Sequence, residues 1–241
     1  GRKTWKRTLN ANSPDTFSPA NRKLQGRTPP GYIAVGGPIG VGKTTLASRL
    51  AEAFNYQVLL EDAHENPFLE RFYQNRKEAA LATQLFFLFQ RSQKIADLRQ
   101  TDIFEPVRVS DFLIDKDPLF ARINLDPDEF SLYEKVFQQL TIDAPRPDLV
   151  IYLQASPDRL LERILTRGVS SERRIDREYL EQINEVYSEF FLYYDAAPLL
   201  IVNANEIDLS QGYEDFAQLV DYLLDIRMVR TILNPPSLVQ P

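Results

Sequence analysis

The feature that most constrains this chain is the segment 37–44, whose sequence GPIGVGKT matches the pattern Gly, four residues, Gly-Lys-Ser/Thr. The apolar run at 32–35 before it predicts a buried strand, and Leu46, Leu50 and Ala53 after it recur at helical spacing. Glycines let backbone N–H groups turn inward around a phosphate, and the N-terminus of the following helix attracts the same anion. We therefore predict a phosphate-binding loop. The alternative is a glycine-rich turn between a strand and a helix that binds no ligand.

The loop gives each of its polar residues a task. Lys43 is expected to neutralise the β and γ phosphates of a nucleotide, and the hydroxyl of Thr44 is expected to hold Mg²⁺. The loop therefore predicts a nucleotide with β and γ phosphates, together with Mg²⁺, as its ligands. The predicted nucleotide-binding residues are Gly37, Gly40, Val41, Gly42, Lys43, Thr44 and Thr45.

Length and composition restrict the class of protein. The chain has 241 residues, 44% of them hydrophobic, which is enough to bury one sizeable core. Cysteine is absent, which excludes disulfides, thiolate metal sites and a cysteine nucleophile and is compatible with a reducing compartment. The longest apolar run, at 85–89, is far shorter than the roughly 20 residues that span a bilayer. We expect a soluble, cytoplasmic protein with no membrane partner.

Charge is distributed unevenly along the chain. The net charge of −6 disfavours broad binding to a nucleic-acid backbone, so no nucleic-acid partner is expected. Residues 1–28 hold seven Lys and Arg residues and one Asp, a net +6, so the remainder carries −12. Residues 1–30 lack apolar periodicity and are predicted to be a basic, flexible tail, the alternatives being a basic docking arm or a targeting remnant. The folded domain is expected over 31–230, with a second tail over 231–241.

Five short apolar runs alternate with helical patterns after the tail. They lie at 32–35, 57–60, 107–110, 149–153 and 199–202. This alternation predicts an α/β fold with a five-stranded parallel sheet flanked by helices. Glu61 follows the second run and Asp111 follows the third, and ligands bind at the carboxyl ends of strands in such sheets. For Glu61 the alternative is a solvated acidic turn.

A long helix is predicted over 78–100, and a further helix over 113–122. Gln84 and Arg91 break the apolar stripe of the first helix and lie seven positions apart, hence on one face. Beside Phe86 and Phe87 they would suit a planar polar ligand that needs both hydrogen bonds and stacking. A solvated helix face is the alternative.

A short charged segment after the fourth strand is predicted to be a lid. Arg163 and Arg167 share one face of the preceding helix because they lie four positions apart. The segment 169–176 that follows is expected to be mobile and basic, as lids beside nucleotide sites are, although an ordinary charged loop is the alternative. Its charged residues are expected to be exposed: Glu172, Arg173 and Arg174.

Together these features resemble the deoxynucleoside kinases, most closely the bacterial deoxyadenosine and deoxyguanosine kinase branch. The resemblance covers about residues 31–205 and rests on separate segments at 37–44, 61, 66–73, 84–91, 163–172 and 178–180. It implies a P-loop kinase fold with a short basic lid. It also implies a homodimer and ATP-dependent phosphorylation of the 5′-hydroxyl of a deoxyribonucleoside, with purines favoured.

The resemblance implies roles in the chemistry for several residues. Glu61 matches the carboxylate that activates the 5′-hydroxyl as general base. Arg163 and Arg167 match the lid arginines that meet the transferred phosphoryl group. With these, the predicted catalytic residues are Glu61, Lys43, Arg163, Arg167 and Asp111.

The resemblance also implies a nucleoside site. Gln84 matches the residue that hydrogen-bonds the edge of the base, with Arg91 nearby on the same helix. Tyr73 and Glu172 match the groups that hold the 3′-hydroxyl. The predicted substrate-binding residues are therefore Tyr73, Gln84, Arg91 and Glu172.

The chain departs from the family pattern at the end of the third strand. The family has an acid followed by Arg and Ser, whereas the corresponding residues here are Ser110, Asp111 and Phe112, with no Arg. An acid displaced by one residue would point to the opposite face of an ideal strand. A local bulge or the end of the strand could restore its direction.

A second departure lies in the lid, where the later arginine of the family falls at Val169. Its charge is either lost or supplied by Arg173 or Arg174. Because of these losses and the basic tail, the alternative function is a non-catalytic, nucleotide-binding subunit of a larger assembly. A nucleoside monophosphate kinase is a third possibility that would need a basic pocket for the acceptor phosphate.

Overall fold

The computed structural model describes residues 29–100, 107–141, 143–205, 209, 212–225 and 231–233. Residues 1–28 of the predicted basic tail lie outside the described residues, as do residues 234–241 of the predicted C-terminal tail.

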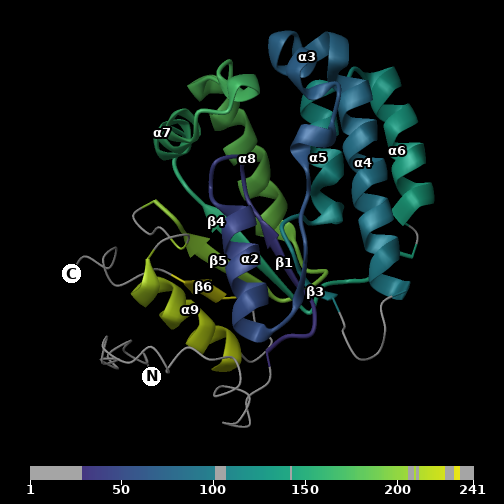
Figure 1. The fold of residues 1–241 in the computed structure, drawn as a ribbon. Helices are drawn as coiled ribbons and strands as arrows, with labels where there is room; N and C mark the ends of the chain where they lie inside the picture. The colour runs from purple at the N-terminus through teal and green to yellow at the C-terminus, as the bar shows by residue number, and fades with distance from the viewer. Residues whose placement is uncertain are drawn as a thin grey trace.

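A parallel sheet forms the centre of the structure (Figure 1). Its strands are β1 (Ile33–Gly36), β2 (Gln57–Leu59), β3 (Val107–Ser110), β4 (Leu149–Gln154), β5 (Leu199–Asn203) and β6 (Thr231–Leu233). They are arranged in the order β2-β3-β1-β4-β5-β6, with every described pairing parallel. The five predicted strands are confirmed.

The sixth strand, β6, corrects the predicted start of the C-terminal tail at residue 231. Residues 231–233 pair with residues 200–202 of β5, whose backbone groups on this side would otherwise form an open edge. A strand of three residues is too short to show a period in the sequence, so its existence depends on this edge.

Helices flank the sheet on both sides and extend beyond it. Their bounds are α2 (Lys43–Phe54), α3 (Leu69–Gln74), α4 (Arg76–Gln100), α5 (Asp117–Asn124), α6 (Pro127–Thr141), α7 (Pro157–Arg167), α8 (Arg177–Tyr193) and α9 (Tyr213–Asp225), with short 3₁₀ turns η2 (Ala63–Glu65), η3 (Ile114–Lys116) and η4 (Ser170–Glu172). Figure 1 shows α4, α5 and α6 side by side, and contacts between them join the three helices. Helix α2 packs against β1 and β3.

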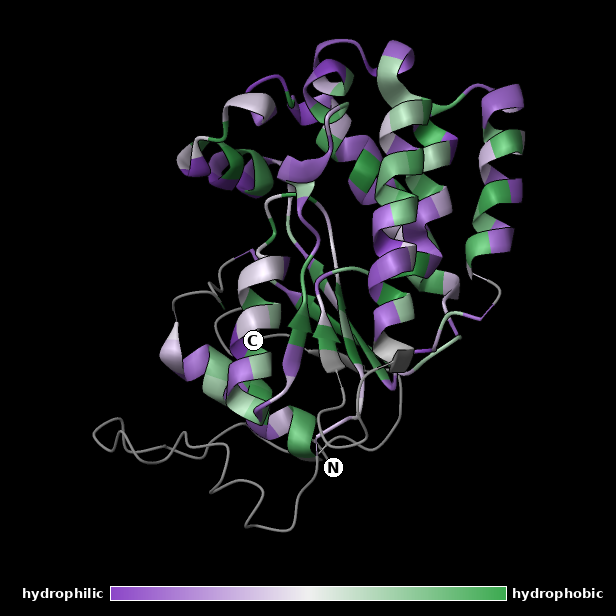
Figure 2. Ribbon diagram, turned by 45° about the vertical axis from the view of Figure 1, so that its right-hand side comes forward, coloured by the Kyte–Doolittle hydropathy of each residue, from purple (hydrophilic) through white to green (hydrophobic). Residues whose placement is uncertain are grey.

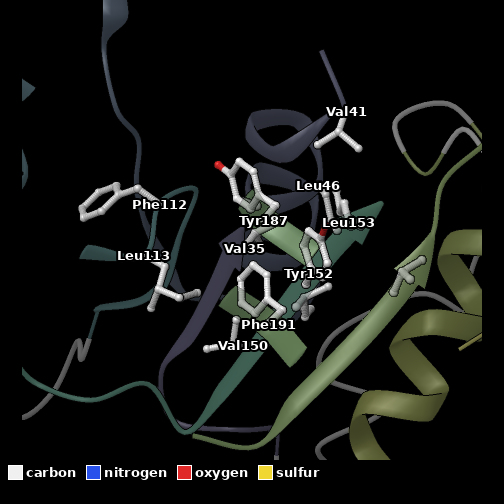
Figure 3. Close-up of a cluster of buried hydrophobic side chains, with 14 of the residues drawn as sticks. Val35, Val41, Leu46, Phe112, Leu113, Val150, Tyr152, Leu153, Tyr187 and Phe191 are labelled. Carbon is white, nitrogen blue, oxygen red and sulfur yellow. The ribbon is translucent and has the colours of Figure 1, made fainter. Parts of the chain in front are cut away.

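The core lies between the sheet and the helices. The middle of the sheet is mostly hydrophobic, whereas the helices also carry hydrophilic segments (Figure 2). Strands β1 and β4 are almost wholly buried, as expected for a parallel sheet covered on both faces. Helix α8 contributes Tyr187 and Phe191, which lie against Tyr152 of β4 (Figure 3), and the stacked rings of Tyr152 and Phe191 have their centres 4.1 Å apart. This aromatic cluster holds α8 against the strands that precede the glycine-rich loop and the lid.

Candidate active site

The loop between β1 and α2 has the backbone conformation that its glycines permit. Gly40 has φ +83° and Gly42 has φ +101°, values that residues with a Cβ atom rarely adopt. A Cβ atom on Gly40 would lie 2.8 Å from Cγ1 of Ile164 and 3.1 Å from the carbonyl oxygen of Leu160, because α7 packs against the loop. Gly42 caps α2, so the N-terminus of this helix faces the loop, as predicted from the sequence.

Lys43 lies within the loop that it is predicted to serve. Its ammonium group donates a hydrogen bond to the carbonyl oxygen of Pro38 at 3.3 Å. Burial and the nearby Lys116 lower the pKa of Lys43 to about 7, and the charges of Glu61 and Asp111 only partly oppose this shift. A phosphate group bound here would favour the charged ammonium form.

Asp111 points toward the loop and not away from it. Its Oδ2 accepts a hydrogen bond from the hydroxyl of Thr44 at 2.7 Å, and its Oδ1 accepts one from the backbone N–H of Glu61 at 2.8 Å. The expected displacement to the opposite face does not occur, because β3 ends at Ser110 and strand alternation no longer fixes the next side chain. Ser110 instead faces Tyr32, with 3.2 Å between the two hydroxyl oxygens. Burial raises the pKa of Asp111, against the two hydrogen bonds that favour its anion.

Glu61 belongs to a buried chain of charges. Its Oε1 accepts a hydrogen bond from Nη2 of Arg91 at 2.5 Å, and Nη1 of Arg91 lies 2.8 Å from Oδ1 of Asp117. Burial by itself lowers the pKa of Arg91, but Asp117 and Glu61 outweigh it and raise the pKa, so the guanidinium stays charged. The sequence analysis missed Asp117 because the residue lay inside the helix predicted over 113–122. In the structure the helix α5 begins only at Asp117.

The predicted nucleoside residues face the same space as the loop. Gln84 and Arg91 are each 6% exposed, so the alternative of a solvated face is excluded. They line a cavity of about 260 Å³ with Tyr73, Phe87 and Glu172. The residues of this cavity that come from the loop and the strand ends are Ile39, Gly40, Gly42, Lys43, Thr44, Thr45, Glu61 and Asp111. The cavity therefore joins the predicted phosphate site to the predicted nucleoside site.

The lid residues are only partly as expected. Glu172 was expected to be exposed, but it is largely buried because it forms an ion pair with Arg167, with oxygen distances of 2.5 and 2.6 Å from Nη2. Both side chains line the cavity. Arg173 and Arg174 are exposed and are not among the residues that line it.

Arg163 binds the loop from outside the cavity. Its guanidinium donates to the carbonyl oxygens of Ala204, at 2.7 Å, and Val41, at 3.4 Å. From α8 the hydroxyl of Tyr187 donates to the carbonyl oxygen of Gly37 at 2.8 Å. Two of the predicted loop residues, Gly37 and Val41, are thus held by α8 and α7.

Lys116 is a cavity residue that the sequence analysis missed. It is 2% exposed and lies at the end of η3. Its position between Asp115 and Asp117 is typical of a charged surface, so no sequence signal marked it. A larger hollow of about 560 Å³ between α5 and α8, lined in part by Tyr193 and Tyr194, contains none of the predicted site residues.

The oxygen groups beside the loop fit Mg²⁺. Within the part of the chain that the structure describes, no group of three or more His, Cys, Asp or Glu residues could hold a metal ion by itself. Mg²⁺ is usually bound by one or two carboxylates together with substrate phosphates and waters, so Asp111 and Thr44 form a suitable set.

None of the described helices is both long and apolar enough to cross a membrane.

Comparisons with known proteins agree with this geometry. A family model described as deoxynucleoside kinase matches residues 33–226. The deoxyguanosine kinase of Bacillus subtilis (strain 168) is 34% identical over 203 residues, which cover 81% of this chain and 97% of that kinase. The deoxyadenosine kinase of Dictyostelium discoideum is 32% identical over 214 residues, which cover 86% of this chain and 84% of that kinase. The solved structure of deoxyadenosine kinase from M. mycoides with bound dCTP has a TM-score of 0.68 and 27% identity, and the match covers 79% of this chain and 98% of that one.

Proposed function

The chain belongs to the deoxynucleoside kinase family, and on this basis we propose that it transfers the γ-phosphoryl group of ATP to the 5′-hydroxyl of a deoxyribonucleoside in nucleotide salvage. One observation carries the proposal: a single cavity contains the loop residues Lys43 and Thr44, the carboxylate of Glu61 and the polar pair Gln84 and Arg91. Phosphate, acceptor hydroxyl and base would each find groups of matching chemistry there.

Glu61 would accept the proton of the 5′-hydroxyl as that oxygen attacks the γ-phosphorus. A general base must lie within hydrogen-bond reach of the proton that it takes. Nη2 of Arg91 holds the carboxylate of Glu61 in place through a hydrogen bond to Oε1 at 2.5 Å. Lys43 would neutralise charge on the β and γ phosphates. Arg167, at the end of α7, would break its ion pair with Glu172 and approach the phosphoryl group. Phosphoryl transfer depends chiefly on such positioning and charge neutralisation.

Thr44 and Asp111 would hold Mg²⁺ beside the phosphates. The bound ion would supply positive charge to the β and γ oxygens. Asp111 keeps its direction through hydrogen bonds from Thr44 and from the N–H of Glu61, which joins the metal site to the strand end that carries the general base.

A purine deoxyribonucleoside is the proposed substrate, and ATP is the proposed phosphate donor. The amide of Gln84 and the guanidinium of Arg91 would read the edge of the base, while Tyr73 and Glu172 would hold the 3′-hydroxyl. The preference for purines is supported by relatives named as deoxyguanosine and deoxyadenosine kinases. Initial rates with deoxyadenosine, deoxyguanosine and deoxycytidine test the proposed preference for purines. Equal or better use of deoxycytidine would overturn this preference.

We also propose a homodimer in the cytoplasm. Large apolar side chains are exposed on neighbouring helices, with Phe89 of α4 at 53% and Leu132 of α6 at 51%, and such side chains often belong to interfaces. The absence of cysteine is compatible with a reducing compartment. Analytical ultracentrifugation would measure the oligomeric state.

A coupled assay of ADP release over the four deoxyribonucleosides tests the proposed activity. The expected result is turnover of at least one purine deoxyribonucleoside. If none turns over while ATP still binds, the chain is instead a non-catalytic nucleotide-binding subunit, which was suggested by the missing arginine at Phe112.

A further inference from the structure

Lys116 is a buried cation to which the mechanism above gives no task. Its side chain is 2% exposed, whereas lysine is almost never fully buried unless it is paired. It lies at the end of η3, immediately before α5, and it lines the same cavity as Lys43 and Glu61. Because a buried charge opposes folding, a lysine at this position needs a reason.

The protein satisfies the ammonium group of Lys116 only in part. Nζ donates a hydrogen bond to the hydroxyl of Tyr187 at 2.8 Å, and this hydroxyl donates to the carbonyl oxygen of Gly37 at 2.8 Å. Nζ also lies 5.5 Å from the ring centre of Phe120. Among the described residues Nζ has no hydrogen-bond acceptor besides Tyr187, and no carboxylate oxygen lies within 4.0 Å of it, so two of its three N–H groups lack a protein acceptor.

The charges around this ammonium group leave room for an anion. Burial and the charge of Arg91 together lower the pKa of Lys116 to about 8, against the opposing charges of Glu61, Asp117 and Asp111. Lys116 and Lys43 line the same cavity, together with Thr44 of the loop. Two lysine side chains thus face one cavity, and an anion between them would be attracted by both.

We infer that the ammonium group of Lys116 donates hydrogen bonds to the phosphoryl group during its transfer, as a second cation beside Lys43. The inference rests on the proposed function, since it needs a phosphoryl group at this point. In the step, the 5′-oxygen forms a bond to the γ-phosphorus, the bond from phosphorus to the β–γ bridging oxygen breaks, and ADP leaves. The proton of the 5′-hydroxyl goes to Glu61, and Lys116 remains protonated. Lys116 would supply charge that Phe112 and Val169 cannot.

The test compares Lys116→Met, which keeps the length of the side chain and removes its charge, with Lys135→Met, which removes an exposed lysine on α6. A third variant, Tyr187→Phe, removes the hydroxyl that links Lys116 to the loop but keeps the ammonium group. For each variant kcat, the KM values for ATP and for the nucleoside, and Tm are measured. Turnover by the wild-type protein comes first, because its absence would refute the proposed function and not this inference.

The expected result for Lys116→Met is a fall in kcat of about 10²-fold or more, with both KM values within about threefold of wild type and Tm no lower. Lys135→Met should match the wild type, and Tyr187→Phe should lose clearly less than Lys116→Met. A kcat within twofold of wild type in Lys116→Met would overturn the inference. An equal loss in Tyr187→Phe, or a loss of activity that follows a lowered Tm, would also overturn it by reducing Lys116 to a support for the loop.

Discussion

The hydroxyl of Thr44 donates a hydrogen bond to Asp111 across 2.7 Å and so ties the first turn of α2 to the end of β3. The other oxygen of Asp111 accepts the backbone N–H of Glu61 at 2.8 Å. With both oxygens engaged, Asp111 is suited to hold Mg²⁺ beside the loop and is less suited to accept a substrate proton. The side chain of Glu61 contacts Arg91 through one oxygen, which leaves it the better base.

Asp111→Asn should therefore act through the metal. We expect kcat to fall and the Mg²⁺ concentration that gives half-maximal rate to rise at least tenfold, because a carboxylate ligand becomes a neutral amide. Initial rates over a Mg²⁺ titration measure this. Thr44→Ser keeps the hydroxyl and is the matched control, which should need no more Mg²⁺ than the wild type. An Asp111→Asn variant with unchanged Mg²⁺ dependence and a large loss at saturation would reassign Asp111 as the base.

Glu61→Gln should keep the shape of the site and remove the base. We expect kcat to fall by about 10²–10⁴-fold, the usual contribution of a general base, while ATP and nucleoside bind within a few-fold of wild type. Single-turnover rates and equilibrium binding separate the two effects. A variant that keeps most of its turnover would show that another group takes the proton.

Gln84→Ala should weaken recognition of the base. Gln84 is buried in the cavity, and removal of a buried hydrogen-bonding partner costs about 1–3 kcal/mol, so kcat/KM for the preferred nucleoside should fall accordingly. The ratio of kcat/KM values between deoxyadenosine and deoxycytidine should move toward one. If this ratio stays at its wild-type value, Gln84 does not read the base.

ATP binding should depend on pH through Lys43. The pKa of Lys43 without bound nucleotide is about 7, below its ordinary 10.5. Above about pH 7 most of the Lys43 side chains are therefore uncharged. Bound phosphates favour the ammonium form, so Lys43 should take up a proton when ATP binds at about pH 8. The Kd for ATP should therefore rise by up to about tenfold for each pH unit above the pKa of Lys43. Titration calorimetry in two buffers of different ionisation enthalpy measures the uptake. The same experiment at about pH 6 is the control, where Lys43 is already charged. Equal uptake at both values would contradict the prediction.

Gly40→Ala and Gly42→Ala form a matched pair within the loop. Both positions have positive φ, but a Cβ atom at Gly40 would meet Ile164 of α7 at 2.8 Å, whereas one at Gly42 would meet nothing within 4 Å. We expect Gly42→Ala to lower the free energy of unfolding by about 1–2 kcal/mol through backbone strain alone. Gly40→Ala should lose clearly more, because the clash adds to the strain. Urea unfolding measures both, and equal losses would show that α7 yields to the added atom.

The sequence predicted those parts of the fold and site that depend on local pattern. Continuous apolar runs correctly predicted five strands. The separation of seven residues correctly predicted that Gln84 and Arg91 lie on one helix face, and both line one cavity. These predictions succeed because strand burial and helical periodicity are properties of neighbouring residues.

The parts that failed depend on residues far apart in the chain. Asp117 and Lys116 become buried only because α5 packs against α4 and α8, and the charge of Asp117 is matched by Arg91 from another helix. Strand β6 exists because β5 offers it an edge. The prediction that Glu172 is exposed was wrong because its side chain pairs with Arg167, which lies on the other side of a turn. None of these relationships has a period that a single sequence displays.

Arg91 lies between Glu61 and Asp117, with one guanidinium nitrogen on each carboxylate. In an enzyme with the proposed chemistry, one side chain would thus serve both the group that takes the proton and the pocket that admits the base. Substrate choice and rate would then evolve together at this position. A laboratory selection for a new nucleoside that altered Arg91 or Asp117 would recover slow catalysts first, and their improvement would require changes that hold Glu61 in place by other means.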